Sequence, residues 1–325
     1  MNYAWPLLAF GVACLSTRVL ATGALAGLAV DIPNQRSLHA APIPRTGGLA
    51  VFLAVLLVWG IGGYAAQYSS LVAATAALVA LSFADDMKGL AVLWRLLGHA
   101  SVSALYAYDC CRQIGPVGLV MVLLVMVWMS NLYNFMDGSD GLAGGMALFG
   151  FSAYACAAHA VPLGAMSLAV AAAAAGFLVF NFPPAKVFMG DAGSIPLGFL
   201  AASLGVLGWR QGLWPLWFPP LVFSPFVVDA SATLLRRLAR GERVWRAHRE
   251  HYYQRLIRMG WSHRRTALAE YALMAAAAAS ALAALGATPA LQGLILALWC
   301  AVYLGLMAAV DRRWRRIARA AGAGD

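Results

Sequence analysis

Long runs of apolar residues constrain the fold of this chain most strongly. Hydrophobic residues make up 62% of its 325 positions and charged residues only 11%, whereas soluble domains carry about a quarter charged residues. Many runs approach the roughly 20 residues that a helix needs to cross a bilayer, and they lack the strict alternation expected of barrel strands. We therefore expect an all-α, polytopic membrane helical bundle.

Hydropathy along the sequence predicts about eleven transmembrane helices in a single integral membrane domain covering residues 1–325. The expected spans are residues 4–24, 47–65, 69–84, 94–109, 116–134, 141–159, 162–180, 194–209, 215–235, 266–286 and 289–310. The first span has no positively charged leading segment and no convincing cleavage site, so we expect it to be retained.

The basic residues predict the orientation of these spans. With the N-terminus outside, 20 of the 23 lysines and arginines fall in cytoplasmic loops or in a cytoplasmic C-terminal tail, as the positive-inside rule requires. The formal net charge of +10 then reflects loops that face anionic lipid, and we do not expect binding to nucleic acid.

Aspartates from distant parts of the sequence fall at the same expected face. They are Asp31, Asp85, Asp86, Asp137, Asp140, Asp191 and Asp229. The span interiors are nearly free of acids, unlike those expected of a proton-coupled transporter. We therefore predict chemistry at the cytoplasmic surface on a lipidic substrate, with active-site loops near residues 31–46, 85–93, 135–141, 181–194 and 236–265.

The most informative loop carries two carboxylates, Asp137 and Asp140, bracketed by glycines at a membrane boundary. Desolvated carboxylates need a cation or another partner. A calcium-binding EF-hand would need a glutamate at the twelfth position, but counting from Asp137 reaches Leu148. A few carboxylates combined with substrate phosphates instead suit Mg²⁺, or Mn²⁺ in its place.

Two further motifs could complete such a site. The adjacent Asp85 and Asp86, followed by Lys88, could share a cation or divide metal binding and proton acceptance between them, although a solvated helix end is the alternative. Asp191 lies between glycines and would open a helix whose free N–H groups favour anions. Phe188 could stack on a base or simply pack.

Basic loops on the same face suit phosphate groups. The first combines a proline and glycine framework with Arg36, His39 and Arg45, cations suited to a diphosphate, although an ordinary positive-inside loop is the alternative. In the late loop, His248 and His251 would be helical neighbours, and we favour phosphate and sugar contacts there. The alternative for its arginines is a basic amphipathic helix on anionic lipid.

In this order, the motifs resemble those of the polyprenyl-phosphate N-acetylhexosamine-1-phosphate transferases, of glycosyltransferase family 4 type. The resemblance rests on Asp85-Asp86-x-Lys88, Asn131-x-x-Asn134-x-x-Asp137-Gly-x-Asp140-Gly-Leu, Phe188-Met-Gly190-Asp191-x-Gly193-Ser194 and the late histidine loop. It implies an enzyme of the bacterial inner membrane that transfers a sugar-1-phosphate from a UDP-N-acetylhexosamine to undecaprenyl phosphate and releases UMP. It also implies Mg²⁺ or Mn²⁺ and is compatible with a homodimer.

The resemblance also implies roles for individual residues. The catalytic candidates are Asp85, Asp86 and Lys88, and the metal-binding candidates are Asp191, Asp86 and Asp137. The substrate-binding candidates are Arg36, His39, Arg45, Asn134, Asp137, Asp140, Phe188, His248 and His251.

The late loop bears on the choice of sugar. Its sequence His248-Arg249-Glu250-His251 keeps two histidines of the pattern in the UDP-GlcNAc branch and replaces the histidine between them by Glu250. We expect the branch that initiates O-antigen or related surface polysaccharides, with GlcNAc or a 6-deoxy sugar such as FucNAc or QuiNAc. The alternatives are the phospho-MurNAc-pentapeptide transferase of peptidoglycan synthesis and, in another class, a membrane transporter or flippase.

Overall fold

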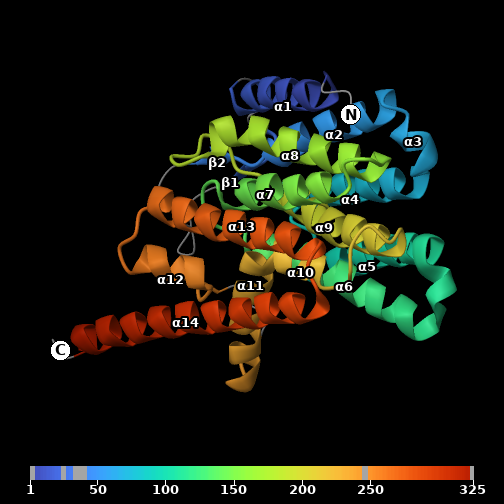
Figure 1. The fold of residues 1–325 in the computed structure, drawn as a ribbon. Helices are drawn as coiled ribbons and strands as arrows, with labels where there is room; N and C mark the ends of the chain where they lie inside the picture. Colours follow the sequence, from blue (N-terminus) through green and yellow to red (C-terminus); the bar gives the residue numbers. More distant parts are fainter. Residues whose placement is uncertain (1–3, 23–26, 32–41, 244–247, 323–325) are drawn as a thin grey trace.

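The protein is a bundle of helices, seen in a computed structural model that describes residues 4–22, 27–31, 42–243 and 248–322 (Figure 1). The helices are α1 (Ala4–Ala21), α2 (Gly47–Ile61), α3 (Tyr64–Gln67), α4 (Ser69–Lys88), α5 (Val92–Cys111), the 3₁₀ turn η2 (Arg112–Ile114), α6 (Gly115–Phe135), α7 (Leu142–Ala157), α8 (Pro162–Asn181), α9 (Asp191–Arg210), α10 (Phe218–Val222), α11 (Ser224–Ala239), α12 (Tyr252–Arg258), α13 (His263–Leu285) and α14 (Pro289–Gly322).

The predicted all-α membrane bundle is confirmed, but the number of eleven spans is not. Every predicted span coincides with helical structure, yet within the described residues seven helical segments are long and apolar enough to cross a membrane. One of them, Val92–Phe135, contains both α5 and α6. Two others, α2 and α7, are apolar but shorter. The ninth predicted span is divided at Phe223 into α10 and α11, where Pro225 cannot donate the backbone hydrogen bond of a continuous helix.

Hydropathy did not predict the short antiparallel ribbon before α2. It consists of β1 (Val30–Asp31) and β2 (Ile43–Pro44), with Val30 paired to Pro44 and Asp31 to Ile43. The carbonyl oxygen of Pro44 also accepts a hydrogen bond from the N–H of Phe188 at 2.7 Å. The ribbon therefore links the first loop to the segment that leads into α9.

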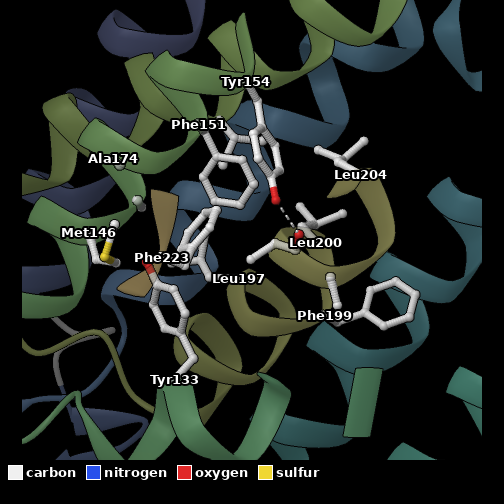
Figure 2. Packing of buried hydrophobic residues seen from close by; sticks show 14 of the residues in the cluster. Tyr133, Met146, Phe151, Tyr154, Ala174, Leu197, Phe199, Leu200, Leu204 and Phe223 are labelled. Atoms are coloured by element: carbon white, nitrogen blue, oxygen red, sulfur yellow. Dashed lines mark hydrogen bonds between the residues drawn. The ribbon is translucent and has the colours of Figure 1, made fainter. Parts of the chain in front are cut away.

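Helix α9 lies at the centre of the bundle. Of its most apolar 18-residue window, 83% is buried inside the protein, and it packs against α4 and α6 in particular. Figure 2 shows aromatic side chains gathered beside it, including Phe151, Tyr154 and Phe223. The hydroxyl group of Tyr154 donates to the carbonyl oxygen of Ala201 on α9 at 2.9 Å. The first turn of α9, which begins at Asp191, therefore belongs to a deeply buried helix.

Glycines allow α2 to approach the start of α9 closely. A Cβ atom on Gly48 would lie 2.2 Å from the backbone nitrogen of Gly193. The N–H of Gly48 donates to the carbonyl oxygen of Met189 at 2.8 Å. Because both contacts involve backbone atoms, a side chain at Gly48 could not be accommodated by a change of rotamer.

We expect Gly48→Ala to destabilise the protein by about 1–3 kcal/mol, the usual cost of overpacking a tight contact. The measurement is thermal unfolding of the purified protein in detergent. Gly60→Ala is the matched control, because no atom lies within 4 Å of a Cβ placed on that glycine of the same helix. An equal effect of the two substitutions would contradict the close approach of α2 and α9.

Candidate active site

Two arginines join three of the predicted aspartates into one charged cluster. Nη1 of Arg95 lies 2.7 Å from Oδ2 of Asp85 and 3.1 Å from Oδ2 of Asp191. Nη2 of Arg45 lies 3.3 Å from Oδ1 of Asp191 and 3.2 Å from Oδ1 of Asp86. The aspartate side chains are nearly buried, whereas about a third of each arginine side chain is exposed. The cluster therefore opens to solvent on its cationic side.

Asp86 holds the N-terminus of α9. Its Oδ1 and Oδ2 atoms accept hydrogen bonds from the backbone N–H groups of Asp191 at 3.2 Å and Ala192 at 2.9 Å. The sequence predicted that α9 begins at Asp191 with free N–H groups that favour an anion, and the structure supplies Asp86 as this anion. Gly190, the residue before Asp191, has φ +72°. A Cβ atom on this glycine would lie 2.8 Å from Oδ2 of Asp86.

Asp85 is fixed by its own helix end. Gly89 ends α4 in a left-handed conformation, and the chain turns so that the N–H of Leu90 donates to Oδ1 of Asp85 at 2.6 Å. The other oxygen faces Arg95. Lys88, the neighbour expected to organise phosphates, is exposed at the end of the helix.

Asp137 belongs electrostatically to the same cluster. Burial raises the pKa of the Asp137 carboxyl well above its usual range, Arg45 opposes this increase, and the negative charges of Asp191 and Asp86 add to it. Burial by itself would lower the pKa of the Arg45 guanidinium, but Asp86 and Asp191 outweigh it and raise that pKa. The aspartates of the site therefore carry more negative charge than Arg45 and Arg95 can neutralise.

Asp140 braces the loops instead of joining the cluster. Its Oδ2 atom accepts from the backbone N–H of Ala185 at 3.0 Å, and its Oδ1 atom lies 3.5 Å from Nδ1 of His263. Asn181 completes the brace, since it accepts from the N–H of Gly141 and donates to the carbonyl oxygen of Val187. Asp140 thus fixes the Asp137 loop against the segment that leads to Asp191.

Asn134 has a similar positioning contact. Its side-chain oxygen accepts from the hydroxyl group of Ser194 at 3.0 Å. Because Ser194 lies in the first turn of α9, this bond ties the end of α6 to the start of α9. The predicted Asn134 and Asp191 regions therefore meet, as one site requires.

The late histidine loop is held by Asp229, which the sequence placed at this face without a role. Nδ1 of His251 lies 3.2 Å from Oδ1 of Asp229. The backbone N–H groups of Tyr252 and Tyr253 also donate to this carboxylate, at 2.9 and 3.1 Å. Asp229 therefore caps α12 and fixes the His251 ring at the same time.

Helix α12 in turn contacts the Asp137 loop. The hydroxyl group of Tyr253 donates to the carbonyl oxygen of Phe135 at 3.1 Å, and the Phe135 and His251 rings stack with centroids 6.2 Å apart. His248 lies before the helix and not on it, because α12 begins at Tyr252. Its ring nevertheless reaches that of His251, with 4.8 Å between centroids.

The remaining predictions have mixed outcomes. Arg36 and His39 lie outside the described residues, so their roles stay predictions. Phe188 is half-buried beside the β ribbon and the start of α2, where its backbone pairs with Pro44 and Gly47. Its proposed contact with a base also stays a prediction.

Sequence reasoning missed Arg95 as a site residue. It had counted this arginine only as one more cytoplasmic cation, although Arg95 pairs with both Asp85 and Asp191. The sequence held one indication of this role, because Arg95 lies near the start of an apolar helix, ten residues after Asp85. An arginine there needs an acidic partner more than one in an open loop does.

The donor set of the cluster suits a hard divalent cation. Carboxylates such as those of Asp191 and Asp137, together with substrate phosphates, are the ligands that Mg²⁺ prefers, but both oxygens of Asp191 contact arginines. No group of three or more histidine, cysteine or acidic side chains is arranged to hold a metal ion among the described residues. Guanidinium groups contact Asp85, Asp86 and Asp191 in this arrangement, so a cation would have to share these carboxylates with the arginines.

Comparison with known proteins gives consistent matches. A sequence profile described as Glycosyl transferase family 4 matches residues 68–208, a range that includes Asp85, Asp86, Arg95, Asp137 and Asp191. The chain is similar to a probable undecaprenyl-phosphate N-acetylglucosaminyl 1-phosphate transferase of Bacillus subtilis, 29% identical over 263 residues that cover 75% of this chain and 74% of the relative.

Two further relatives differ in their named substrates. A decaprenyl-phosphate N-acetylglucosaminephosphotransferase of Mycolicibacterium smegmatis is 31% identical over 294 residues, which cover 75% of this chain and 72% of the relative. A phospho-N-acetylmuramoyl-pentapeptide-transferase of Geobacillus kaustophilus is 29% identical over 265 residues, which cover 71% of this chain and 80% of the relative.

The raised pKa of Asp137 predicts a pH dependence of stability. The folded protein keeps this proton to a higher pH than the unfolded chain, whose pKa is about 3.9. Stability is therefore lost as the pH rises from that value to the pKa of the folded protein. We expect Asp137→Asn to gain stability relative to the wild type over this interval, measured by thermal unfolding with chelator present.

Asp109→Asn is the control for this prediction. Asp109 is exposed near the end of α5, far along the helix from Arg95, and its substitution should leave the pH dependence unchanged. A constant difference in unfolding temperature between Asp137→Asn and the wild type across pH would show that Asp137 ionises normally.

Proposed function

The chain belongs to glycosyl transferase family 4, and from this premise we propose that it transfers an N-acetylhexosamine-1-phosphate from a UDP-sugar to undecaprenyl phosphate. The products are UMP and a lipid-linked diphosphate sugar. The observation that carries this proposal is the cluster of Asp85, Asp86 and Asp191 with Arg45 and Arg95, at the ends of apolar helices.

The charges of the cluster suit a reaction between two anions. An oxygen of the lipid phosphate attacks the β-phosphorus of the UDP-sugar, and the bond from this phosphorus to UMP breaks. Repulsion between the two phosphates must be screened, and the attacking oxygen must be held in line. Arg45 and Arg95 are partly exposed and can turn from the aspartates to phosphate oxygens, with which arginine forms bidentate contacts.

We assign different tasks to the aspartates. Asp85 is the candidate to orient the lipid phosphate or accept its proton, because one of its oxygens faces Arg95 at the open side of the cluster. Asp86 acts as a positioning residue, since both of its oxygens hold the start of α9. Transfer by direct attack needs no further nucleophile from the protein.

Asp191 and Asp137 would hold Mg²⁺, with Asp86 beside them. When bound, the ion supplies positive charge that polarises the phosphoryl group and stabilises the leaving phosphate. The excess of buried acid around Arg45 is consistent with a site that needs one more cation. Asp140 and Asn134 support this arrangement by fixing the loops, and His248, His251 and Phe188 are candidates for contacts to the UDP-sugar.

An apolar cavity of about 410 Å³ lies beside α6, α9 and the α10–α11 break. Its lining includes Met129, Ala202 and Phe223. A cavity of this composition within the membrane suits prenyl units. The cavity follows α6 and α9 away from the ends that carry Asn134 and Asp191, a direction in which a long polyprenyl chain could extend from the cluster.

We place the reaction at the cytoplasmic face of the bacterial inner membrane, with the N-terminus outside. The cluster, α12 and the arginines of residues 236–243 and 249–265 lie at one end of the bundle, because Tyr253 contacts Phe135 and His263 contacts Asp140. An end rich in arginine is the cytoplasmic one under the positive-inside rule.

The donor is the least constrained part of the proposal. The two N-acetylglucosamine relatives favour GlcNAc, and the late loop with Glu250 favours initiation of O-antigen or a related surface polysaccharide. A 6-deoxy sugar such as FucNAc or QuiNAc is the variant of this proposal. The similarity to a phospho-N-acetylmuramoyl-pentapeptide-transferase keeps the peptidoglycan precursor as a second candidate donor.

The test is release of UMP by the purified protein with undecaprenyl phosphate, Mg²⁺ and a panel of UDP-N-acetylhexosamines that includes UDP-MurNAc-pentapeptide. We expect one donor to support turnover and chelator to abolish it. Asp85→Asn and Asp191→Asn should each lower kcat at least about 100-fold, as losses of groups that act in the transition state do.

The matched control is Asp109→Asn, which removes the same charge at an exposed position away from the cluster. It should retain wild-type turnover. All variants should unfold at temperatures close to the wild type, so that loss of activity does not reflect loss of fold. Failure of every donor, or unimpaired Asp191→Asn, would refute the proposed function.

A further inference from the structure

The protein has a second cleft, apart from the apolar cavity beside α6 and α9. It lies between α11, α13 and α14, and α12 also contributes to its lining. Helix α14 runs along the edge of the bundle and crosses α11 (Figure 1). Only 6% of its most apolar window is buried, and it is fastened at a few polar points. Tyr303 meets Ser224 at 2.6 Å between hydroxyl oxygens, and Nε1 of Trp299 donates to Ser280 at 2.8 Å.

The long part of this cleft is an apolar cavity of about 660 Å³. On α14 its lining runs from Trp299 to Arg313, a distance of about 21 Å at 1.5 Å per residue. One leaflet of the membrane, half of a hydrocarbon core of about 30 Å, is thinner than this length. The cavity is therefore long enough for an acyl chain that starts at one surface of the membrane.

A separate polar pocket of about 520 Å³ lies next to this cavity, and residues of α11, α12 and α14 line both. Five arginines line it against two carboxylates, Glu250 and Asp311. The arginines are Arg236, Arg240, Arg255, Arg258 and Arg315. Arg236 and Arg255 pair with Asp311, and Arg240 pairs with Glu250 and Glu242. The remaining positive charge, on Arg258 and Arg315, suits a bound anion.

Tyr252 lies between the apolar cavity and the polar pocket. Its ring lines the apolar cavity, and the guanidinium groups of Arg236 and Arg255 lie 5.2 and 5.3 Å from its centroid. Trp314 lines the polar pocket beside Arg258, whose guanidinium is 4.7 Å from the indole centroid. A tryptophan at this boundary is typical of residues at the level of lipid headgroups.

Glu270 also lines the apolar cavity. It lies seven residues, or about 10 Å, from the start of α13 at His263. Glu270 is thus about two turns into α13 and does not line the polar pocket. Asp229, the other acid of the lining, is already engaged by His251 and α12.

We propose that this cleft binds one anionic glycerophospholipid, with its phosphate among the arginines and an acyl chain in the apolar cavity. The site is distinct from the acceptor site, because Asp85, Asp86 and Asp191 line neither cavity. It has a consequence for the catalytic end, since α12 separates the two regions and Tyr253 on it holds the Asp137 loop. A lipid in the cleft would fix α12 and α14 together.

The test is binding of dioleoyl-phosphatidylglycerol to the purified full-length protein, measured by native mass spectrometry and by the shift of the unfolding temperature. We expect one lipid per chain, bound at least tenfold more tightly than dioleoyl-phosphatidylcholine, which has the same acyl chains. Equal binding of the two lipids would overturn the proposal. So would displacement of the lipid by inorganic phosphate alone, or by undecaprenyl phosphate at lower concentration than by phosphatidylglycerol itself.

Variants locate the site. Arg258→Gln combined with Arg315→Gln removes two pocket charges without touching the pairs of Asp311 with Arg236 and Arg255, and should weaken phosphatidylglycerol binding at least tenfold. Arg264→Gln combined with Arg312→Gln removes two exposed charges that line neither cavity and should change binding less than twofold. Equal effects of the two pairs would overturn the assignment.

A third variant tests the acyl cavity independently of charge. Ala276 lines the cavity but is exposed on α13, so Ala276→Trp should fill the space without disturbing the packed core. We expect it to weaken phosphatidylglycerol binding at least tenfold with all arginines present. Unchanged binding would overturn the acyl-chain part of the proposal, and none of these readouts depends on UMP release.

Discussion

The carboxylate of Asp86 at the N-terminus of α9 is the contact on which the candidate site depends. It satisfies two backbone N–H groups of a helix that is buried in the bundle, where unpaired donors would be costly. In doing so it fixes Asp191 within reach of Arg45 and Arg95. The deeply buried helix α9 thus begins at the charged cluster, and its packing in the bundle positions Asp191.

Around this contact, carboxylates serve two different purposes. Asp140 and Asp229 bind backbone N–H groups and histidines, and they hold loops in place. Asp85 and Asp191 face arginines that remain partly exposed. Aspartates of the first kind organise the backbone, whereas the arginines beside the second kind are exposed enough to reach a substrate. This division explains why so many aspartates at one face do not all face one substrate.

Much of the candidate site could be predicted from the sequence, because its aspartates follow apolar runs that must end at the membrane surface. Arg95 could not be assigned, because nothing in its own segment tells which acids it meets. The β ribbon was missed because two residues per strand carry no periodic signal. The break at Phe223 was missed because hydropathy responds to composition and not to the continuity of helical hydrogen bonds. The late histidines would have been neighbours on a helix, but α12 begins only at Tyr252 and both histidines precede it.

By itself, the sequence determined that this chain is a helical membrane protein with a group of aspartates at one face. The reason is that the length of each apolar segment and the positions of the charged residues around it decide how the segment inserts into a bilayer. The family motifs determined the class of chemistry. Only the tertiary structure decided which acid caps α9, which face arginine and which brace loops. It also decided that α14 leaves a cleft lined by Tyr252 and the arginines beside it. These pairings join residues up to 146 positions apart in the sequence. Which residues meet at such separations depends on how the helices pack against one another.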